Sequence, residues 1–491
     1  MKMVSKYIRE QKLYTKKELK TIFCFSTEEV VEFIKQLKAL SILKTVRNSA
    51  TQQEILDLDE ESNFLVIDDE SKSDDCLYFF SYVGVITIYS RIIKCYPKYL
   101  LSETTPMEEM KQILKVISRY GSKKQIINLA NGDAEDSRLN ILSVILFLLN
   151  DYNEFGIYNN TKDIVEVNGE GEILWDKTIN ENHPFISKAR PYYTELYTMK
   201  ALDDDTDFFK QLHECVLTEC SKQLDESELL HLFDLPAVNL SDNVLADFGD
   251  LDYILYRLQS QLNIEFNTRK QIVLKTLYAY ISHSNTQKDD FGISMYGTNS
   301  FNLVWENVCS EVFNNKLQTP LGQLKLPVPL HNGYQPSDKL INIIKKPLWT
   351  GNKAGGGTFE KPAKETLIPD LITIMEQDGS IQFIILDAKY YNIQLDEEKV
   401  LKGYPGINDV TKQYLYQLSY KDFLHDHEIN NVKNCFLMPT EFNEVVDKGM
   451  VKMDMLSSLG LKDIQIRQLP AKTMYSYYLK RMSMDVSVLR L

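Results

Sequence analysis

The chain has 491 residues, of which 44% are hydrophobic and 25% charged, as is typical of a globular protein with two or three domains. The longest apolar run, Ile141–Leu149, is too short to span a bilayer, and the N-terminus lacks the apolar core of a signal peptide. Seven cysteines without metal-binding spacing indicate a reducing compartment, so we expect a cytoplasmic protein with no membrane partner. The net charge of −14 argues against a protein coated in nucleic acid but allows a locally basic binding surface.

Residues 1–50 are predicted to form a helix-turn-helix or winged-helix module. Thr15 followed three residues later by Glu18 is a capping-box pattern, and a second helix is expected to begin at Ser26. Ile42–Val46 would be a wing strand. Up to residue 48 the chain carries eleven Lys or Arg against five acidic residues, whereas ten acidic residues crowd the next segment, 54–75. Such a module binds DNA in some proteins and protein in others, and both interpretations stay open.

The middle region, about residues 75–290, is predicted to mix small β elements with helices. Strand patterns occupy Cys76–Lys98, and apolar residues recur at helical spacing over Met107–Asn153. Asn168-Gly169 predicts a hairpin within Asp163–Ile179, in which Trp175 is expected to be a core residue. Further helices are expected over His183–Cys220 and Ser227–Ser284.

A basic, glycine-rich segment follows in the C-terminal part. It combines Trp349 and three adjacent glycines with five lysines, namely Lys345, Lys346, Lys353, Lys361 and Lys364. One interpretation is a flexible flap that clamps the phosphodiester backbone, and the other is a mobile surface loop whose lysines are merely solvated. We favour the flap because the segment leads into the strand that carries Asp370.

Two β-rich runs around Asp378-Gly379 predict a hairpin. A two-residue turn there pairs Asp370 with Asp387, and side-chain alternation places Lys389 on the same side as Asp387. Like charges directly opposite one another destabilise a sheet, so this pair makes sense when a divalent cation lies between the carboxylates. The pattern predicts a hydrolytic site for a hard metal ion, with Mg²⁺ as the default and Mn²⁺ as a substitute. The alternative is an ordinary buried Asp–Lys pair.

Other chemistries have weaker support. His425 and His427, flanked by acidic residues, imitate a transition-metal site, but no further ligand has clear spacing and an exposed polar loop is favoured. The pattern Gly-x4-Gly-Lys-Ser/Thr is absent from the sequence, so the chain is not expected to hydrolyse nucleotides itself.

The carboxylate and lysine pattern resembles the PD-(D/E)XK nuclease superfamily. Glu306, on a predicted helix over Phe301–Cys309, matches the acidic residue of the family's preceding helix. Gln413, on a predicted helix beginning at Asn408-Asp409, matches the family's helix glutamine, although Gln417 is an alternative. Further segments resemble LlaJI-type restriction endonucleases, relatives of the McrC subunit of McrBC-like systems; these are Phe80–Ile88, Cys95–Tyr99, Asn168–Ile179 and Tyr296–Phe301.

This resemblance implies a multidomain α/β chain whose residues 291–491 form a PD-(D/E)XK core, a mixed sheet flanked by helices. Asp370 and Asp387 would bind Mg²⁺, with the Ala388 carbonyl as a further ligand, and Glu306 would either bind the metal or position an outer-shell water. Lys389 would stabilise the attacking hydroxide or the developing phosphorane charge, and Gln413 would orient the lysine or the nucleophile.

The resemblance further implies a double-stranded DNA substrate, a role in restriction of foreign DNA, and activation by a McrB-like AAA+ NTPase subunit. The region ahead of the nuclease core, roughly residues 75–290, would dock on that partner. An autonomous endonuclease that needs no NTPase and a non-catalytic adaptor that stimulates the NTPase stay open as alternatives. Oligomerisation and the choice between GTP and ATP stay open as well.

Overall fold

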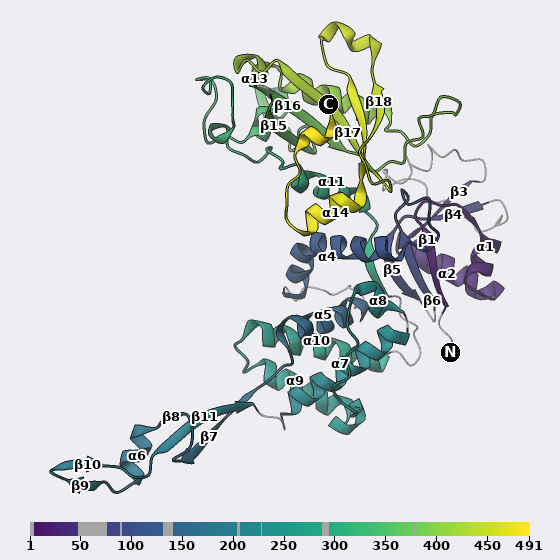
Figure 1. Ribbon diagram of the computed structural model, residues 1–491. Coiled ribbons are helices and arrows are strands. Elements are labelled where there is room, and N and C mark those ends of the chain that lie inside the picture. Colours follow the sequence, from purple (N-terminus) through teal and green to yellow (C-terminus); the bar gives the residue numbers. More distant parts are fainter. Residues whose placement is uncertain are drawn as a thin grey trace. The chain divides into compact units, whose positions relative to one another are not determined.

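The computed structural model describes residues 4–47, 76–88, 91–130, 141–203, 207–226, 228–286, 294–377 and 379–491 (Figure 1). The chain forms two compact units. The helical unit comprises residues 1–3, 87–90 and 135–296, and the sheet unit comprises residues 4–86, 91–134 and 297–491. These units cut across the predicted ranges 1–50, 75–290 and 291–491, whose functional assignments stay predictions. The predicted acidic segment 54–75 lies outside the described residues.

The N-terminal part of the sheet unit has the elements of a winged helix. Its members are β2 (Tyr14–Thr15), α1 (Lys16–Ile22), α2 (Thr27–Ala39), β3 (Leu43–Arg47) and β4 (Cys76–Phe80), and the strands form an antiparallel sheet in the order β2-β4-β3. The predicted capping box at Thr15 is confirmed, and a second one at Ser26 begins α2. Phe33 and Leu37 of α2 are buried, so its apolar face closes the small core.

An additional strand, which the sequence did not predict, precedes this module. β1 (Val4–Arg9) pairs in parallel with β6 (Arg91–Tyr96), which is followed in the sheet by β5 (Val83–Ile88). The strands predicted over Cys76–Lys98 are therefore confirmed as β4, β5 and β6. The long helix α4 (Met107–Ala130) follows, and residues 131–140 of the predicted helical run lie outside the described residues.

The helical unit is built from α5, α7, α8, α9 and α10, which pack on one another within the unit (Figure 1). Their bounds are Ile141–Phe155, Phe208–Glu226, Leu229–Phe233, Leu251–Leu262 and Thr268–Thr286, and the short 3-10 helix η1 covers Leu245–Phe248. His213 of α7 is fully buried and its Nδ1 accepts a hydrogen bond from the Tyr158 N–H at 3.0 Å. Burial lowers the pKa of His213 to about 3, so this histidine is a neutral core group.

Residues 161–203 form an extension of the helical unit, which we call the apolar arm (Figure 1). It contains β7 (Thr161–Val167), β8 (Glu172–Ile173), α6 (Trp175–Glu181), β9 (Phe185–Ser187), β10 (Arg190–Tyr192) and β11 (Tyr197–Asp203). The predicted hairpin at Asn168-Gly169 is wrong, because β7 and β8 both pair with β11 in the order β7-β11-β8. The helix predicted from His183 is also wrong up to Asp203, where these strands lie.

Trp175 was expected in the core, but it is 53% exposed. It is the first residue of α6, a two-turn helix whose one buried residue is Thr178. The apolar arm therefore carries a large aromatic side chain on its surface.

The C-terminal part of the sheet unit is a mixed five-stranded sheet in the order β15-β16-β17-β19-β18. Antiparallel pairs lie at its two edges and parallel pairs at its centre. The strands are β15 (Leu371–Gln377), β16 (Ser380–Ala388), β17 (Asn431–Thr440), β18 (Val446–Val451) and β19 (Ile464–Pro470). The helices of this part are α11 (Phe301–Val312), α12 (Ile407–Ser419), α13 (Lys421–Asp426) and α14 (Ala471–Leu479). The expected mixed α/β organisation is confirmed.

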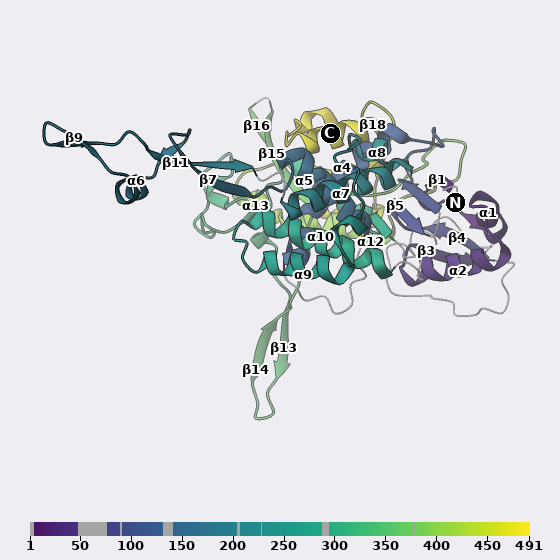
Figure 2. The same ribbon diagram turned by 90° about the horizontal axis from the view of Figure 1, so that it is seen from below.

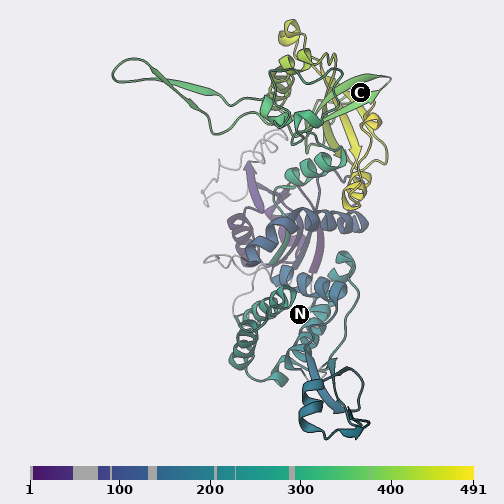
Figure 3. The same ribbon diagram turned by 90° about the vertical axis from the view of Figure 1, so that its left-hand side faces the viewer.

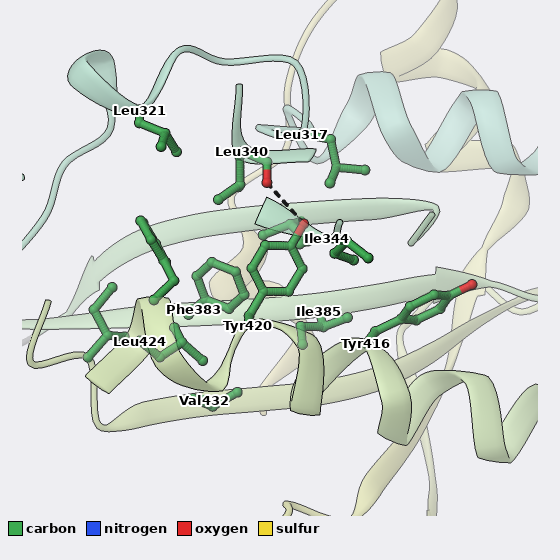
Figure 4. Close-up of a cluster of buried hydrophobic side chains, with 13 residues drawn as sticks. Leu317, Leu321, Leu340, Ile344, Phe383, Ile385, Tyr416, Tyr420, Leu424 and Val432 are labelled. Atoms are coloured by element: carbon green, nitrogen blue, oxygen red, sulfur yellow. Dashed lines mark hydrogen bonds between the residues drawn. The ribbon is translucent and has the colours of Figure 1, made fainter. Parts of the chain in front are cut away.

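Two apolar clusters hold this sheet. In the first, Tyr420 packs against Phe383 with ring centroids 5.3 Å apart, and its hydroxyl donates to the Leu340 carbonyl at 3.3 Å (Figure 4). Leu317, Leu321 and Ile344 complete this cluster from the segment before β15. The second cluster contains Tyr391, Tyr414, Phe436, Met438 and Ile466. β16 and α12, which carry the predicted site residues, are thereby held by well-packed side chains.

Residues 345–366 form a projecting hairpin, which we call the basic arm (Figures 2 and 3). β13 (Leu348–Asn352) pairs with β14 (Thr358–Pro362), so the segment predicted as a flap is an ordered two-stranded ribbon. Short 3-10 turns, η2 (Leu321–Gln323) and η3 (Leu340–Ile343), precede it, and β12 (Ser294–Thr298) leads from the helical unit into the sheet unit along the chain. No helix within the described residues is long and apolar enough to cross a membrane.

Candidate active site

The two aspartates meet as the hairpin pattern predicts. β15 pairs with β16 so that Leu371 lies opposite Leu386, which places Asp370 and Asp387 opposite each other at the next position. Asp370 accepts a hydrogen bond at Oδ2 from the Ala388 N–H at 2.8 Å. The predicted register is therefore confirmed, although Asp378 of the turn lies outside the described residues.

Asp387 is the most buried acid of the site. Its side chain is 3% exposed, and its Oδ1 atom is buried without a hydrogen-bond partner among the described residues. Burial raises the pKa of Asp387 well above its ordinary value, and the hydrogen bond and charge of Asp370 raise it further. The surroundings of Asp387 therefore disfavour its anionic form, and a bound cation would stabilise that form.

Asp370 is slightly more accessible and differs in its partners. Burial raises its pKa too, but the hydrogen bond from Asp387 and that from Ala388 oppose the increase. Its backbone is held by Asn315, whose side-chain amide donates to the Asp370 carbonyl at 3.0 Å. The pKa values of both carboxyl groups are therefore raised, that of Asp387 the more strongly.

Lys389 lies beside the pair, as side-chain alternation predicts. Its Nζ is 3.3 Å from Asp387 Oδ2 and donates to Asp409 Oδ1 at 2.8 Å. Burial alone lowers the pKa of Lys389, but the negative charges of Asp387 and Asp409 outweigh it and the pKa is raised. Lys389 is therefore a permanent cation aimed at the carboxylates.

Asp409 is the residue that sequence reasoning missed. It was named only as the start of a helix, yet it lies in the first turn of α12 and binds both Lys389 and the Tyr391 hydroxyl, the latter at 3.3 Å from Oδ2. The sequence feature that could have identified it is its position one turn before Gln413, on the same face of the predicted helix. The Lys389 ammonium group is thus bound by two carboxyl groups, those of Asp387 and Asp409.

Gln413 has a different surrounding from the one expected. It is fully buried and its amide donates to Asn434 Oδ1 at 2.5 Å and to the Ile385 carbonyl at 3.4 Å. The alternative, Gln417, accepts a hydrogen bond from the Lys462 N–H at 3.0 Å. Neither glutamine bonds Lys389 within the described part of the chain, so the orienting role of Gln413 stays a prediction without a supporting contact.

Glu306 approaches the site from α11. The neighbouring Trp305 anchors this helix, since it is fully buried and its Nε1 donates to the Leu437 carbonyl at 3.1 Å. Burial raises the pKa of Glu306, the charge of Asp387 raises it further, and Lys389 opposes the increase. Glu306 therefore interacts electrostatically with both groups, and its role at the metal stays a prediction.

The donor set fits Mg²⁺. The buried Oδ1 of Asp387 without a partner, opposite a second carboxylate, is a position at which a cation would replace a missing contact. Among the described residues no group of three acidic, histidine or cysteine side chains is gathered as a preformed metal cage. Mg²⁺ commonly binds through one or two carboxylates and keeps several waters, whereas structural zinc demands four protein ligands. The Ala388 carbonyl remains a predicted additional ligand.

The histidine pair is not a metal site. His427 was expected in an exposed loop, but it is fully buried. Its Nε2 accepts a hydrogen bond from the His331 N–H at 3.1 Å, and its Nδ1 lies 2.7 Å from the Phe423 carbonyl oxygen. Both ring nitrogens are therefore occupied. The His425 side chain is 89% exposed, so the two rings do not converge.

A model of the LlaJI restriction endonuclease family matches residues 82–474. The chain belongs to the LlaJI restriction endonuclease family. The resemblance to this family is thus confirmed, and this LlaJI-family chain is a nuclease of a restriction system.

One curated relative is the type II restriction enzyme BsuMI component YdjA of Bacillus subtilis (strain 168). It is 28% identical over 422 residues, which are 84% of this chain and 82% of YdjA. Two solved Thermococcus gammatolerans structures are similar in part. A half-complex of McrB AAA+ hexamers with bound McrC gives a TM-score of 0.38 at 11% identity over 99% of this chain and 96% of that one. The McrBC complex gives a TM-score of 0.23 at 10% identity, over 56% of this chain and 79% of the chain in that structure.

Proposed function

We propose that this chain is the Mg²⁺-dependent DNA endonuclease subunit of a restriction system, with a PD-(D/E)XK active site and an AAA+ NTPase partner. The observation that carries the catalytic part is the buried, unpartnered Asp387 Oδ1 opposite Asp370, with Lys389 at 3.3 Å from Asp387 Oδ2. An ordinary buried Asp–Lys pair would satisfy its oxygens within the protein. This pair leaves one oxygen, Asp387 Oδ1, without a hydrogen-bond partner in the described part of the chain.

The residues have separate roles in hydrolysis of a phosphodiester bond. Asp370, Asp387 and Glu306 would hold Mg²⁺, which when bound supplies Lewis-acid polarisation of the phosphate and a more acidic water. Lys389 stabilises negative charge that develops on the phosphate oxygens, because its ammonium group is held rigidly by Asp409. Asp409 thus takes the orienting role that was predicted for Gln413.

Three observations support a partner that supplies nucleotide hydrolysis. The sequence has no Gly-x4-Gly-Lys-Ser/Thr loop, so nucleotide-dependent activation requires another chain. YdjA is named as a component of its restriction enzyme, which fits a multi-chain assembly. The apolar arm offers a docking surface, with Trp175, Phe185, Ile186 and Tyr192 each more than half exposed. Exposed apolar patches of this kind mark protein-binding sites.

The test is plasmid cleavage by the full chain with Mg²⁺, with and without a McrB-like AAA+ NTPase from the same genome and GTP or ATP. We expect cleavage only with partner and nucleotide, and none by Lys389→Ala. Cleavage by Mg²⁺ alone would favour an autonomous endonuclease. Stimulated nucleotide hydrolysis without cleavage in any combination would favour the non-catalytic adaptor.

A further inference from the structure

The basic arm carries an aromatic surface that the nuclease chemistry does not use. In its register Trp349 lies opposite Lys361 and Gly351 opposite Phe359. Residues directly opposite one another in an antiparallel pair share a face, so Trp349, Phe359 and Lys361 lie on one face of the ribbon. Trp349 is 72% exposed and Phe359 is 42% exposed. Glu360 pairs with Thr350 and belongs to the opposite face.

The position of the Phe359 ring depends on the glycine opposite it, Gly351. A Cβ atom on Gly351 would lie 2.6 Å from the Phe359 ring, so the glycine leaves the space in which this ring lies flat over the ribbon. Lys361 Nζ is 5.6 Å from the centroid of the same ring. The aromatic face is thus a defined platform with a cation at its edge.

The arm is held at its base and open along its length. The Ala363 N–H donates to the Pro347 carbonyl at 2.7 Å, and the Thr366 hydroxyl donates to the Lys345 carbonyl at 2.9 Å. Ile344, just before the arm, belongs to the cluster of Figure 4, and Leu367, just after the arm, packs against that cluster. Every residue of β14 is exposed, so no protein core explains the rings.

The charge of the arm is opposite to that of the chain. Residues 345–366 contain five lysines and two glutamates, whereas the whole chain has a net charge of −14. All five lysines are exposed, and none forms an ion pair with another described residue. An exposed cation on an otherwise acidic protein attracts a polyanion, and aromatic faces add stacking on bases.

We propose that the basic arm binds DNA next to the active site, with its lysines on phosphates and the Trp349 and Phe359 rings stacked on unpaired bases. The arm ends four residues before Asp370, so a strand held by it continues toward the metal-binding end of β15 and β16. This inference rests on the proposed endonuclease function. It adds a recognition surface that prefers DNA with locally separated strands over intact duplex.

The experiment measures binding of fluorescein-labelled duplex DNA, with and without a central bubble of unpaired bases, by anisotropy at several salt concentrations. The full chain carries Asp387→Asn so that no strand is cut. The ring variant is Trp349→Ala with Phe359→Ala, and the charge variant is Lys353→Ala with Lys361→Ala. Phe442→Ala is the ring control, since this exposed aromatic lies elsewhere in the sheet unit. Lys325→Ala with Lys452→Ala is the charge control, since both lysines already form ion pairs.

We expect the ring variant to weaken bubble binding at least about tenfold and to change duplex binding much less. The charge variant should weaken both and reduce the slope of log affinity against log salt by roughly two. The controls should match the parent chain. Unchanged binding in both variants, with the parent still binding DNA, would overturn the inference, leave the nuclease proposal standing and favour a protein-docking hairpin. Equal loss on duplex and bubble in the ring variant would overturn base stacking. A parent chain that does not bind DNA and, with Asp387 restored, does not cut DNA even with partner and nucleotide present would overturn both proposals.

Discussion

The basic arm and the apolar arm are similar in structure, but their surfaces suit different binding partners. Both are extended ribbons that expose aromatic residues, Trp349 and Phe359 in the basic arm and Trp175, Phe185 and Tyr192 in the apolar arm. Their charges differ in sign. The basic arm has five lysines and two glutamates, whereas the apolar arm, residues 161–203, has five basic and eight acidic residues. Charge thus separates a surface suited to a polyanion from one suited to a protein partner, although exposed aromatic area is common to both.

The largest effect should come from the site that both arms serve. Asp387→Asn keeps the shape of the side chain but removes the carboxylate, so we expect plasmid cleavage to fall by at least about a thousandfold. DNA binding and partner binding should persist, because neither arm is touched. Asp396→Asn, an exposed acid that pairs with Lys399, is the control and should cleave normally. Loss of DNA binding together with cleavage would show that chemistry and recognition are not separate.

A smaller effect should follow from charging the apolar arm. Phe185→Asp with Ile186→Asp places two acids on side chains that are 68% and 63% exposed. We expect the nucleotide-dependent stimulation of cleavage to drop at least about tenfold, since apolar anchors at an interface carry most of its binding energy. The measurement is cleavage at increasing partner concentration.

The control for the apolar arm is Phe266→Asp. Phe266 is 93% exposed in the helical unit but lies outside the arm. Equal loss of stimulation in the control and the arm variant would indicate general damage to the helical unit. Unchanged stimulation in both variants would show that the apolar arm does not bind the partner.

The buried pair should also affect stability, in a direction that depends on pH. The pKa of Asp387 is raised in the folded chain, so its favourable contribution is present at low pH and is lost as the pH rises through that value. The amide introduced by Asp387→Asn cannot ionise, so this variant should raise the melting temperature of the metal-free chain by a few degrees at neutral pH and by less near pH 4. Thermal unfolding in chelator checks this. A variant less stable than the parent at neutral pH would mean that the pair is an ordinary structural contact.

The smallest effect concerns the geometry of the basic arm. Gly351→Ala adds a methyl group where only 2.6 Å separates the Cβ position from the Phe359 ring. The ring must turn away, so we expect binding of bubble DNA to weaken about three- to fivefold. Gly355→Ala, in the arm's tip with no atom within 4 Å of its Cβ position, should bind like the parent.

Local patterns in the sequence predicted the centre of this site well. The Asp378-Gly379 turn joins adjacent strands, so the register of Asp370 and Asp387 follows from a contact between near neighbours. The caps at Thr15 and Ser26 are equally local. The same reasoning failed at Asn168-Gly169, because β11, nearly 30 residues later, takes both flanking strands as partners. A turn motif predicts that the chain reverses direction, but it does not predict which strands pair afterwards.

The residues that escaped prediction depend on contacts between distant segments. Asp409 reaches Lys389 only because α12 packs across the sheet, and sequence spacing does not report how a helix lies on a sheet. His427 is buried because the segment around His331, 96 positions earlier, supplies an N–H to its ring. Gln413 matches a family position, yet the side chain of Asn434 on β17 takes its amide.

The most direct test of the account is calorimetric titration of Mg²⁺ into the full chain and into its Asp387→Asn variant at neutral and acidic pH. We expect the parent to bind Mg²⁺ at neutral pH and more weakly at acidic pH. Protons compete with Mg²⁺ for the Asp387 carboxylate, and the raised pKa of this group strengthens the competition. The variant should not bind measurably. Equal Mg²⁺ binding by the two proteins would contradict the claim that Asp370 and Asp387 form the metal site.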